Sequence, residues 1–330
     1  MKRWIALAAT VLVVPALAPA APATAQAAPL NPVSALNDQL AKGVRVRVVE
    51  QSKVRMAGGR IVNHMAYGSG YGVQNRGSLQ LGRSGVVASD MTRRLTFESV
   101  ARQVAQDNAQ GGDKQSQSLL TLTQAHRSIS VKGWRYASGK HYAPLLPEGK
   151  TWALLQRSSG AAAAFGDQVI NVFEPAVLKA LLIKKNTDGT VVAIKGFDGR
   201  KRKATLYSGT TTFSKLYELS STFREIVGRK LDTVTGGIQV GWGVFTDEKG
   251  LPFQIISFWE ISDNRPFFRN TTTTEYVGWG SPAPIVAPPG SKVTRSSWPA
   301  NGLPESDDNA DVLITPQPPG VPKKSFVPWK

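Results

Sequence analysis

The distribution of apolar residues along the chain predicts short helices separated by many strands. Residues 31–42 form the first expected helix, because Asn31 is a good N-cap, Pro32 suits the first turn and Gly43 ends the pattern. Three apolar side chains share one face of this helix: Val33, Leu36 and Leu40. Valines then occupy every second position from 44 to 48, which predicts a half-buried strand.

The rest of the chain up to about residue 280 continues this mixture of elements. Glycine and short apolar alternations before residue 97 predict several antiparallel strands. A helix that begins at Ser214 and ends at Val227 carries an apolar stripe on one face. The other expected elements are a helix over 97–109, strands at 129–131 and 134–136, a turn at 146–152 before another strand, a helix from Glu174-Pro175, and two strands flanking the turn 196–199.

Residues 238–259 predict a β-hairpin with one face that is almost entirely large and apolar. The turn Asp247-Glu248-Lys249-Gly250 joins its strands, and Gly250 supplies the positive φ that such turns need. In the expected register, Val244 faces Phe253 and Trp242 faces Ile255. The apolar candidates are Ile238, Val240, Trp242, Val244, Phe253, Ile255 and Trp259. Such a face packs against helices or surrounds an apolar ligand, and the residues alone leave both interpretations open.

The first 27 residues have the pattern of a secretory signal peptide. Met1-Lys2-Arg3 gives a basic start, residues 4–17 are apolar, and Ala25-Gln26-Ala27 is an Ala-x-Ala site. We therefore expect cleavage near Ala27 and a secreted, extracytoplasmic protein, since a membrane span requires roughly 18 apolar residues. Residues 28–295 are expected to form one domain, and the proline-rich residues 296–330 a partly disordered tail.

The chain is strongly basic, with a formal net charge of +17. Such a charge attracts anionic partners over long range, and for an exported protein these are an anionic membrane surface or an acidic wall polymer rather than nucleic acid. The candidate contact residues lie in a basic segment and are Lys184, Lys185, Lys195, Arg200, Lys201, Arg202 and Lys203. A solvated strand edge protected by charge explains the same segment equally well.

The sequence offers little that resembles a catalytic or metal site. It contains no cysteine, which excludes disulfides, thiolate metal sites and a cysteine nucleophile. His64, His126 and His141 lack ligands at metal-binding spacing, and no serine lies in a Gly-x-Ser-x-Gly motif. Asp247 and Glu248 are adjacent, but they occupy an expected solvated turn. We therefore expect no catalytic residue, no metal and no cofactor, and a buried serine beside a histidine would be the sign of a hydrolase.

Several stretches, taken in order, resemble the LolA-like family, especially the LppX and LprG type of exported actinobacterial lipoproteins. They are "NPVSALNDQLAKGVRVRV", "LPEGKTWALL", "EPAVLKALL" with "LYSGTTTFSKL", and "VFTDEKGLPFQI" with "TTTTEYVGWGSPAPIVAPPGSKV". The resemblance covers most of residues 31–293. The chain departs from the family in lacking the lipid-accepting cysteine, and residues 97–127 look like an insertion or an altered strand pair.

The resemblance implies an α+β fold in which a large curved antiparallel sheet, a half-barrel, is closed by helices around an apolar core or cavity. Family members carry or sense acylated lipids without catalysis. We therefore expect a secreted, non-enzymatic, monomeric binder or carrier of lipids or lipoconjugates in the cell envelope that is not anchored by a lipid. Two alternatives stay open: an envelope interaction or stress-sensing module of the same fold, similar to the regulator RseB, and a basic binder of anionic cell-wall polymer.

Overall fold

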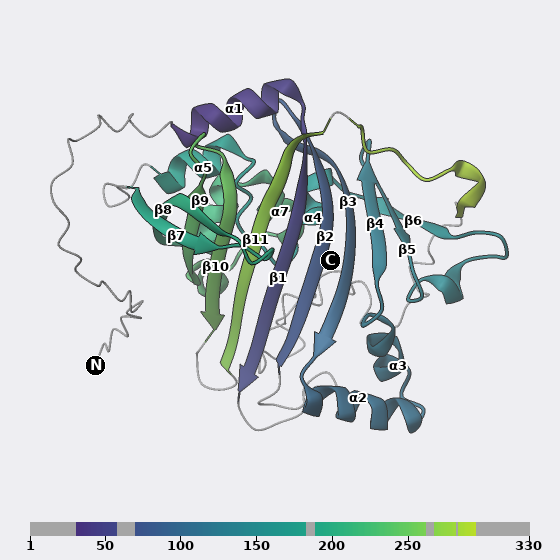
Figure 1. The fold of residues 1–330 in the computed structure, drawn as a ribbon. Helices are drawn as coiled ribbons and strands as arrows, with labels where there is room; N and C mark the ends of the chain where they lie inside the picture. Colours follow the sequence, from purple (N-terminus) through teal and green to yellow (C-terminus); the bar gives the residue numbers. More distant parts are fainter. Residues whose placement is uncertain (1–30, 58–69, 183–188, 262–266, 282, 295–330) are drawn as a thin grey trace, which may run out of the picture.

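The fold is a mixed α+β arrangement around one large sheet. The computed structural model describes residues 31–57, 70–182, 189–261, 267–281 and 283–294. Within these residues, eight α-helices accompany a curved, unclosed sheet of twelve strands (Figure 1). The expected signal peptide (1–27) and tail (296–330) lie outside the described residues.

Short helices and longer strands alternate irregularly along the chain. The helices are α1 (Pro32–Lys42), α2 (Ser99–Gln110), α3 (Lys114–Thr121), α4 (Gly160–Ala164), α5 (Pro175–Leu182), α6 (Phe213–Leu219), α7 (Ser221–Val227) and α8 (Thr233–Gly236), with 3-10 turns at Ala143–Leu145 and Gly290–Lys292. The strands are β1 (Arg45–Ala57), β2 (Gly70–Gly82), β3 (Gly85–Phe97), β4 (His126–Val131), β5 (Trp134–Ser138), β6 (Trp152–Arg157), β7 (Thr190–Lys195), β8 (Lys201–Thr212), β9 (Gln239–Thr246), β10 (Pro252–Ile261), β11 (Phe267–Ser281) and β12 (Val293–Thr294).

The strands lie in the order β12-β6-β5-β4-β3-β2-β1-β11-β10-β9-β8-β7. All neighbours pair antiparallel except β12 and β6, where Val293 lies opposite Trp152 in a parallel pair. The expectation of a large curved antiparallel sheet is therefore confirmed for eleven strands, and it is wrong for the short pairing at the edge. The long strand β11 pairs with both β1 and β10. It therefore connects strands β1 to β6 on one side of the sheet with strands β7 to β10 on the other.

The start of the described chain folds as its sequence predicts. The Oδ1 atom of Asn31 accepts hydrogen bonds from the backbone of Val33 at 3.0 Å and Ser34 at 3.4 Å, and this caps α1. Gly43 ends the helix with a φ of +60°, a conformation that favours glycine. Strand β1 follows, and it continues well past residue 49.

Helices cover one face of the sheet, which we call the covered face. In Figure 1, α4, α5 and α7 lie behind the strands, while α1 crosses one end of them. Side chains of α1, α5, α6 and α7 form a single buried apolar cluster with the strands. Members of this cluster from the helices include Leu36, Leu40, Val177, Leu178, Leu181, Phe213, Leu216, Phe223 and Val227.

The expected helix from Ser214 to Val227 is in fact two helices. Thr212, rather than Ser214, caps α6, because its Oγ1 atom accepts a hydrogen bond from the backbone N–H of Lys215 at 3.1 Å. Ser220 then interrupts the pattern and caps α7, since its Oγ atom accepts from Phe223 N at 2.9 Å. A serine within an apolar stripe thus starts a new helix instead of continuing the old one.

Two helices fill most of the segment 97–127, for which an insertion or an altered strand pair was expected. The helix expected over 97–109 is confirmed as α2, and α3 follows it after Gly112, which has a φ of +89°. Asp113 caps α3 through a 2.8 Å hydrogen bond from Ser116 N to its carboxylate. The two helices lie beyond the ends of the neighbouring strands β3 and β4 (Figure 1).

The hairpin of β9 and β10 has the expected turn but a different register. Gly250 has a φ of +75°, and the carboxylate of Asp247 accepts the N–H groups of Lys249 and Leu251, both at 2.9 Å. Val244 lies opposite Ile255 rather than Phe253, because the register shifts between Pro252 and Gln254. Proline lacks an N–H group for the ladder, which favours an irregularity at this point.

Candidate functional site

Two carboxylates lie buried close to one another on the covered face. Glu50 of β1 and Asp167, from the loop between α4 and α5, are 2% and 1% exposed. The Nδ2 atom of Asn75 on β2 donates to Oε1 of Glu50 at 2.7 Å and to Oδ2 of Asp167 at 3.4 Å. One amide group therefore connects the two carboxylates, and we call this arrangement the Glu50–Asp167 cluster.

Further side chains of the sheet complete the Glu50–Asp167 cluster. The Nη2 atom of Arg93 on β3 lies 3.0 Å from Oδ2 of Asp167. The Oγ1 atom of Thr274 on β11 donates to Oε2 of Glu50 at 2.8 Å. Thr272 donates to the backbone carbonyl of Asp167 at 3.1 Å. The cluster therefore ties the loop between α4 and α5 to four strands of the sheet.

The electrostatics of the cluster favour one retained proton. Burial, and secondly the charge of Asp167, raises the pKa of Glu50 to about 7, although hydrogen bonds from Thr274 and Asn75 and the charge of Arg93 act against this. Burial also raises the pKa of Asp167, and Arg93 opposes that rise. Because one arginine balances two carboxylates, Glu50 is the group that gains or loses a proton near neutral pH.

A small polar cavity of about 30 Å³ adjoins the cluster, and we call it the Arg93 cavity. Its wall comes from strands β2 to β5 on one side and from α4 on the other. The lining residues are Asn75, Met91, Arg93, His126, Ser128, Arg135, Ala162, Ala163, Ala164 and Gly166. Arg93 thus both pairs with Asp167 and faces the cavity.

A close backbone contact holds α4 over the Arg93 cavity. A Cβ atom added to Gly160, at the start of α4, would lie 2.5 Å from the backbone nitrogen of Ala88 on β3. Only glycine permits this approach, because real Cβ atoms do not come so close to backbone atoms. Ser159 caps α4 through a 3.0 Å hydrogen bond from Ala162 N.

Most of the predicted apolar site residues come together inside the protein. Val240, Trp242, Val244, Ile255 and Trp259 belong to the main buried cluster, and the half-buried Ile238 packs against it. Trp259 contacts Phe213 of α6 and Phe268 of β11, with ring centroids 5.3 and 5.1 Å apart. These side chains are packed against neighbouring protein groups, so the apolar face is filled in this conformation.

Phe253 does not share this face. It is buried in a second cluster with Ala204 and Phe245, against which Val192, Ile194, Leu206 and Ile256 pack. The register shift between Pro252 and Gln254 places Phe253 on the side of the sheet that the β7–β8 hairpin covers. The assignment of Phe253 to the same face as Trp242 is therefore wrong.

Several polar atoms within the apolar interior have no hydrogen-bond partner among the described residues. They are Nε1 of Trp242, Nε1 of Trp259, the hydroxyl of Tyr276 and Nε1 of Trp279. An unsatisfied buried donor typically costs about 1–3 kcal/mol. Trp242, Trp259 and Tyr276 are at most 3% exposed, so bulk water does not satisfy them. Trp242 and Trp259 lie near one another in the register, whereas Tyr276 and Trp279 lie further along β11.

The predicted basic residues gather on the β7–β8 hairpin as far as the described residues extend. Lys195, Arg200, Lys201 and Lys203 are exposed, and Lys195 lies directly opposite Lys201. Arg202 instead pairs with Asp198 and is half-buried. Lys184 and Lys185 lie outside the described residues.

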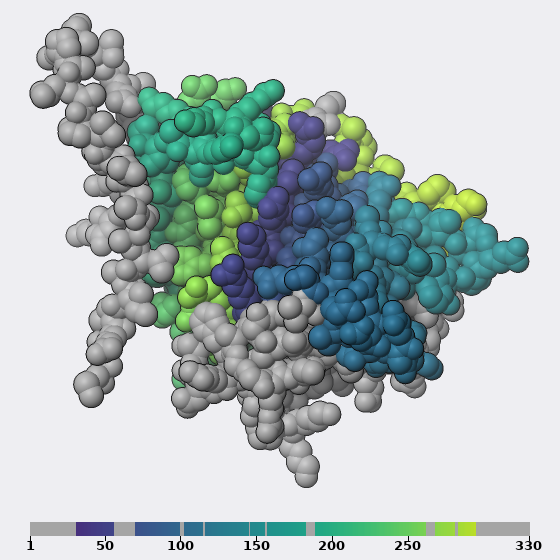
Figure 2. Space-filling view, turned by 60° about the horizontal axis from the view of Figure 1, so that its bottom comes forward, coloured from purple at the N-terminus to yellow at the C-terminus, as the bar shows by residue number. Residues whose placement is uncertain are grey.

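The β7–β8 hairpin folds back over the face of the sheet that the helices leave uncovered (Figure 2). At its tip, Phe197 N donates to Oε1 of Glu275 on β11 at 2.8 Å, and Gln254 of β10 donates to the same atom at 2.9 Å. Burial under the hairpin raises the pKa of Glu275, while these hydrogen bonds oppose the rise. The hairpin is thus fixed to the sheet at its tip as well as along β8.

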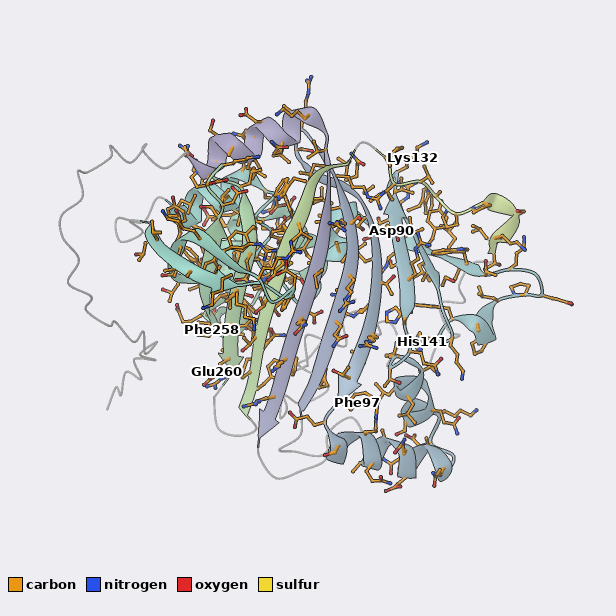
Figure 3. All side chains as sticks on the ribbon, in the orientation of Figure 1. Asp90, Phe97, Lys132, His141, Phe258 and Glu260 are labelled. Carbon is orange, nitrogen blue, oxygen red and sulfur yellow. The ribbon has the colours of Figure 1, made fainter. Side chains whose placement is uncertain are left out.

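Two of the three histidines lie in the part of the chain that the structure describes, and His126 shares the Arg93 cavity with the buried Ser128. His141 lies beside α3 (Figure 3), where its Nδ1 atom is 2.8 Å from Oγ1 of Thr121. The hydroxyl of Thr121 also donates to the carbonyl of Ser118 at 2.6 Å. His126 lines the Arg93 cavity, and His64 lies outside the described residues.

Sequence reasoning missed the Glu50–Asp167 cluster, although one signal for it was present. Glu50 and Ser52 continue the every-second-residue series of Val44, Val46 and Val48, which predicts that both face the interior. Asp167 and Arg93 carried no comparable signal, because their contact joins a loop to a distant strand.

Among the described residues, no group of three or more His, Cys, Asp or Glu side chains is placed to hold a metal ion. No described helix has the length and apolar character needed to cross a membrane.

Neither a protein-family model nor a curated protein matches this chain. The resemblance to the LolA-like family therefore rests on the quoted motifs alone, and it stays a prediction.

Proposed function

We propose that this protein is an exported, non-enzymatic carrier of lipids or other acylated molecules in the cell envelope. The observation that carries the proposal is the pair of buried indole N–H groups, on Trp242 and Trp259, without partners among the described residues of an apolar interior. A core that only packs against itself gains nothing from such donors. Ester, amide or hydroxyl oxygens of an acylated ligand would satisfy them.

The cover over these residues suits a ligand-binding interior. Helices α6 and α7 have 7 residues each and are separated by Ser220. Helices this short are marginal on their own and depend on packing for their stability. Phe213 of α6 packs against Trp259, and Phe223 of α7 packs against Phe213, with ring centroids 5.3 Å apart in each pair. In the proposed mechanism these two helices move away, and an acyl chain takes the place of the Phe213 ring against Trp259.

Quenching of tryptophan fluorescence by brominated acyl chains tests the proposal. Bromine quenches only indoles that it contacts, so uptake of a brominated fatty acid should reduce the emission of the wild-type protein. Trp259→Phe should remove a large part of this quenching. Trp134→Phe is the matched control, because Trp134 is 37% exposed and stacks with Arg157 outside the main cluster. Quenching that is absent, or that is lost equally in both variants, would contradict the proposal.

A second candidate function, docking on an anionic surface, is favoured by the β7–β8 hairpin. Like charges that lie directly opposite on paired strands repel each other, and Lys195 faces Lys201 in this way. Lys203 and Arg200 add two exposed charges nearby. An anionic membrane or wall polymer would relieve this repulsion, at about 1 kcal/mol per basic residue near a membrane surface.

Binding to anionic vesicles tests docking of the β7–β8 hairpin on a membrane surface. The variant Lys195→Ala/Lys201→Ala/Lys203→Ala should lose most of its binding to vesicles that contain about 30% phosphatidylserine, because such membranes have a strong negative surface potential. Replacing exposed Lys140, Lys215 and Lys292 with Ala gives a control of equal charge on other parts of the surface. Equal losses in the two triple variants would show that net charge alone attracts the protein.

A further inference from the structure

The Arg93 cavity combines features that the proposed acyl interior lacks. Its lining includes two guanidinium groups, from Arg93 and Arg135, and none of its described lining residues is acidic. The hydroxyl of Ser128, the amide of Asn75 and the ring of His126 supply further polar atoms. The wall is therefore rich in hydrogen-bond donors, which suits a ligand rich in acceptors.

The arginines of this cavity are held in place by their surroundings. Arg93 has a side chain that is only 16% exposed, and its ion pair with Asp167 fixes the guanidinium group. The Nε atom of Arg135 donates to Oγ of Ser128 at 3.0 Å. Both groups are thus oriented before a ligand arrives, which reduces the entropy cost of binding.

The size of the cavity limits what can enter. About 10–15 Å³ of such space holds one water molecule. The Arg93 cavity, at about 30 Å³, therefore has space for a small polar group but not for an acyl chain. Planar guanidinium groups bind the oxygens of phosphate and carboxylate groups in pairs, with short charge-assisted hydrogen bonds.

We propose that the Arg93 cavity is a binding site for a compact oxyanion of the phosphate class, held by Arg93 and Arg135 with Ser128 as a further donor. The oxyanion is either a free ion or the head group of an amphipathic molecule. This site goes beyond the proposed acyl binding and does not depend on it, because its residues are separate from Trp242 and Trp259.

Titration calorimetry of the full-length mature protein, at fixed ionic strength, tests this site with two probes. Inorganic phosphate represents the free ion, and dihexanoyl phosphatidic acid below its micelle concentration represents a head group. If phosphate binds saturably and the phosphatidic acid binds with a similar affinity, the site is assigned to the free ion. Binding of the phosphatidic acid that is at least about tenfold tighter, and is competed by phosphate, would assign it to a head group.

Two variants show whether binding occurs in this cavity. Arg135→Gln should weaken binding of both probes by about tenfold or more, since it removes a charge-assisted donor pair. Arg127→Gln is the matched control, because Arg127 lies on the adjacent β4, is 51% exposed and pairs with Asp90. Phosphorus NMR line broadening of phosphate gives a second readout for a variant of reduced stability. The proposal is wrong if neither probe binds saturably at millimolar concentration, or if both variants bind equally well.

Discussion

The carboxylates of Glu50 and Asp167 share one hydrogen-bond donor, the Nδ2 atom of Asn75, at 2.7 and 3.4 Å. Both are buried, and Arg93 is the cation that pairs with Asp167. Burying two carboxylates beside one arginine is expensive unless a proton is retained. This relationship makes the stability of the protein depend on pH and on the integrity of the cluster.

Lowering the pH from about 8 to about 5 should stabilise the native protein through Glu50. Burial raises its pKa from 4.5 to about 7, so the folded state binds the proton more tightly than the unfolded state. This contribution of Glu50 to the free energy of unfolding is fully present below about pH 4.5 and is lost as the pH rises through about 7. It amounts to at most about 3 kcal/mol. Urea denaturation across this range should show this slope in the wild type and not in Glu50→Gln. Glu260→Gln, at a surface pair with Arg269, should keep the slope, and a slope unchanged in Glu50→Gln would contradict this account.

Removing Arg93 should destabilise the protein more than removing both partners of the ion pair. Arg93→Met leaves Asp167 buried without its cation, which we expect to cost about 3–5 kcal/mol. Arg93→Met/Asp167→Asn should recover at least half of that loss, because no unpaired charge remains. Guanidinium denaturation of the wild type, Arg93→Met, Asp167→Asn and the double variant measures the difference. A double variant that is as unstable as the sum of its single variants would show that the pair is not coupled.

Replacing Gly160 should disturb the contact between α4 and β3. A Cβ atom at this position would meet backbone atoms of Ala88 at 2.5 to 2.8 Å, and backbone cannot move aside as a side chain can. Gly160→Ala should therefore lower the free energy of unfolding by about 1–3 kcal/mol. Gly290→Ala is the control, since a Cβ atom there meets nothing within 4 Å. Thermal unfolding of both variants is the measurement, and equal midpoints would contradict the close approach.

Glu174 should control how firmly α7 is held. Its Oε1 atom accepts from Ser221 Oγ at 2.5 Å, Thr222 N at 2.9 Å and Thr222 Oγ1 at 3.0 Å. Glu174→Gln weakens these bonds and removes a negative charge from a helix start, so we expect a loss of about 1–2 kcal/mol. If α6 and α7 cover the acyl site, stopped-flow uptake of a fluorescent fatty acid should become faster. Glu218→Gln, at an exposed pair with Lys215, should leave both quantities unchanged.

Local signals in the sequence predicted those parts of the fold that local interactions determine. The cap at Asn31, the stop at Gly43 and the turn at Gly250 all depend on residues within a few positions. The same reasoning joined α6 and α7, because Ser220 has no local feature that separates a cap from a helical serine. Only the hydrogen bond from Phe223 N decides between them.

Long-range contacts account for what the sequence did not predict. The position of Phe253 depends on a register shift at Pro252, and the shift places its ring under the β7–β8 hairpin. Packing also determines the position of an exposed side chain on that side of the sheet. The ring of Phe258, 51% exposed on β10 (Figure 3), lies over Gly241, where a Cβ atom would meet it at 2.1 Å. Asp167 and Glu275 became buried only through segments that fold back from far along the chain.

Mass spectrometry of the protein's own lipid extract tests the proposed function most directly. The protein is purified without detergent from cells that make it naturally, washed, and extracted with organic solvent. We predict an acylated compound in near-stoichiometric amount, and a smaller amount from a Trp242→Phe/Trp259→Phe variant that lacks the two buried donors. An extract without acylated compounds, from protein that also takes up no brominated fatty acid, would contradict the account.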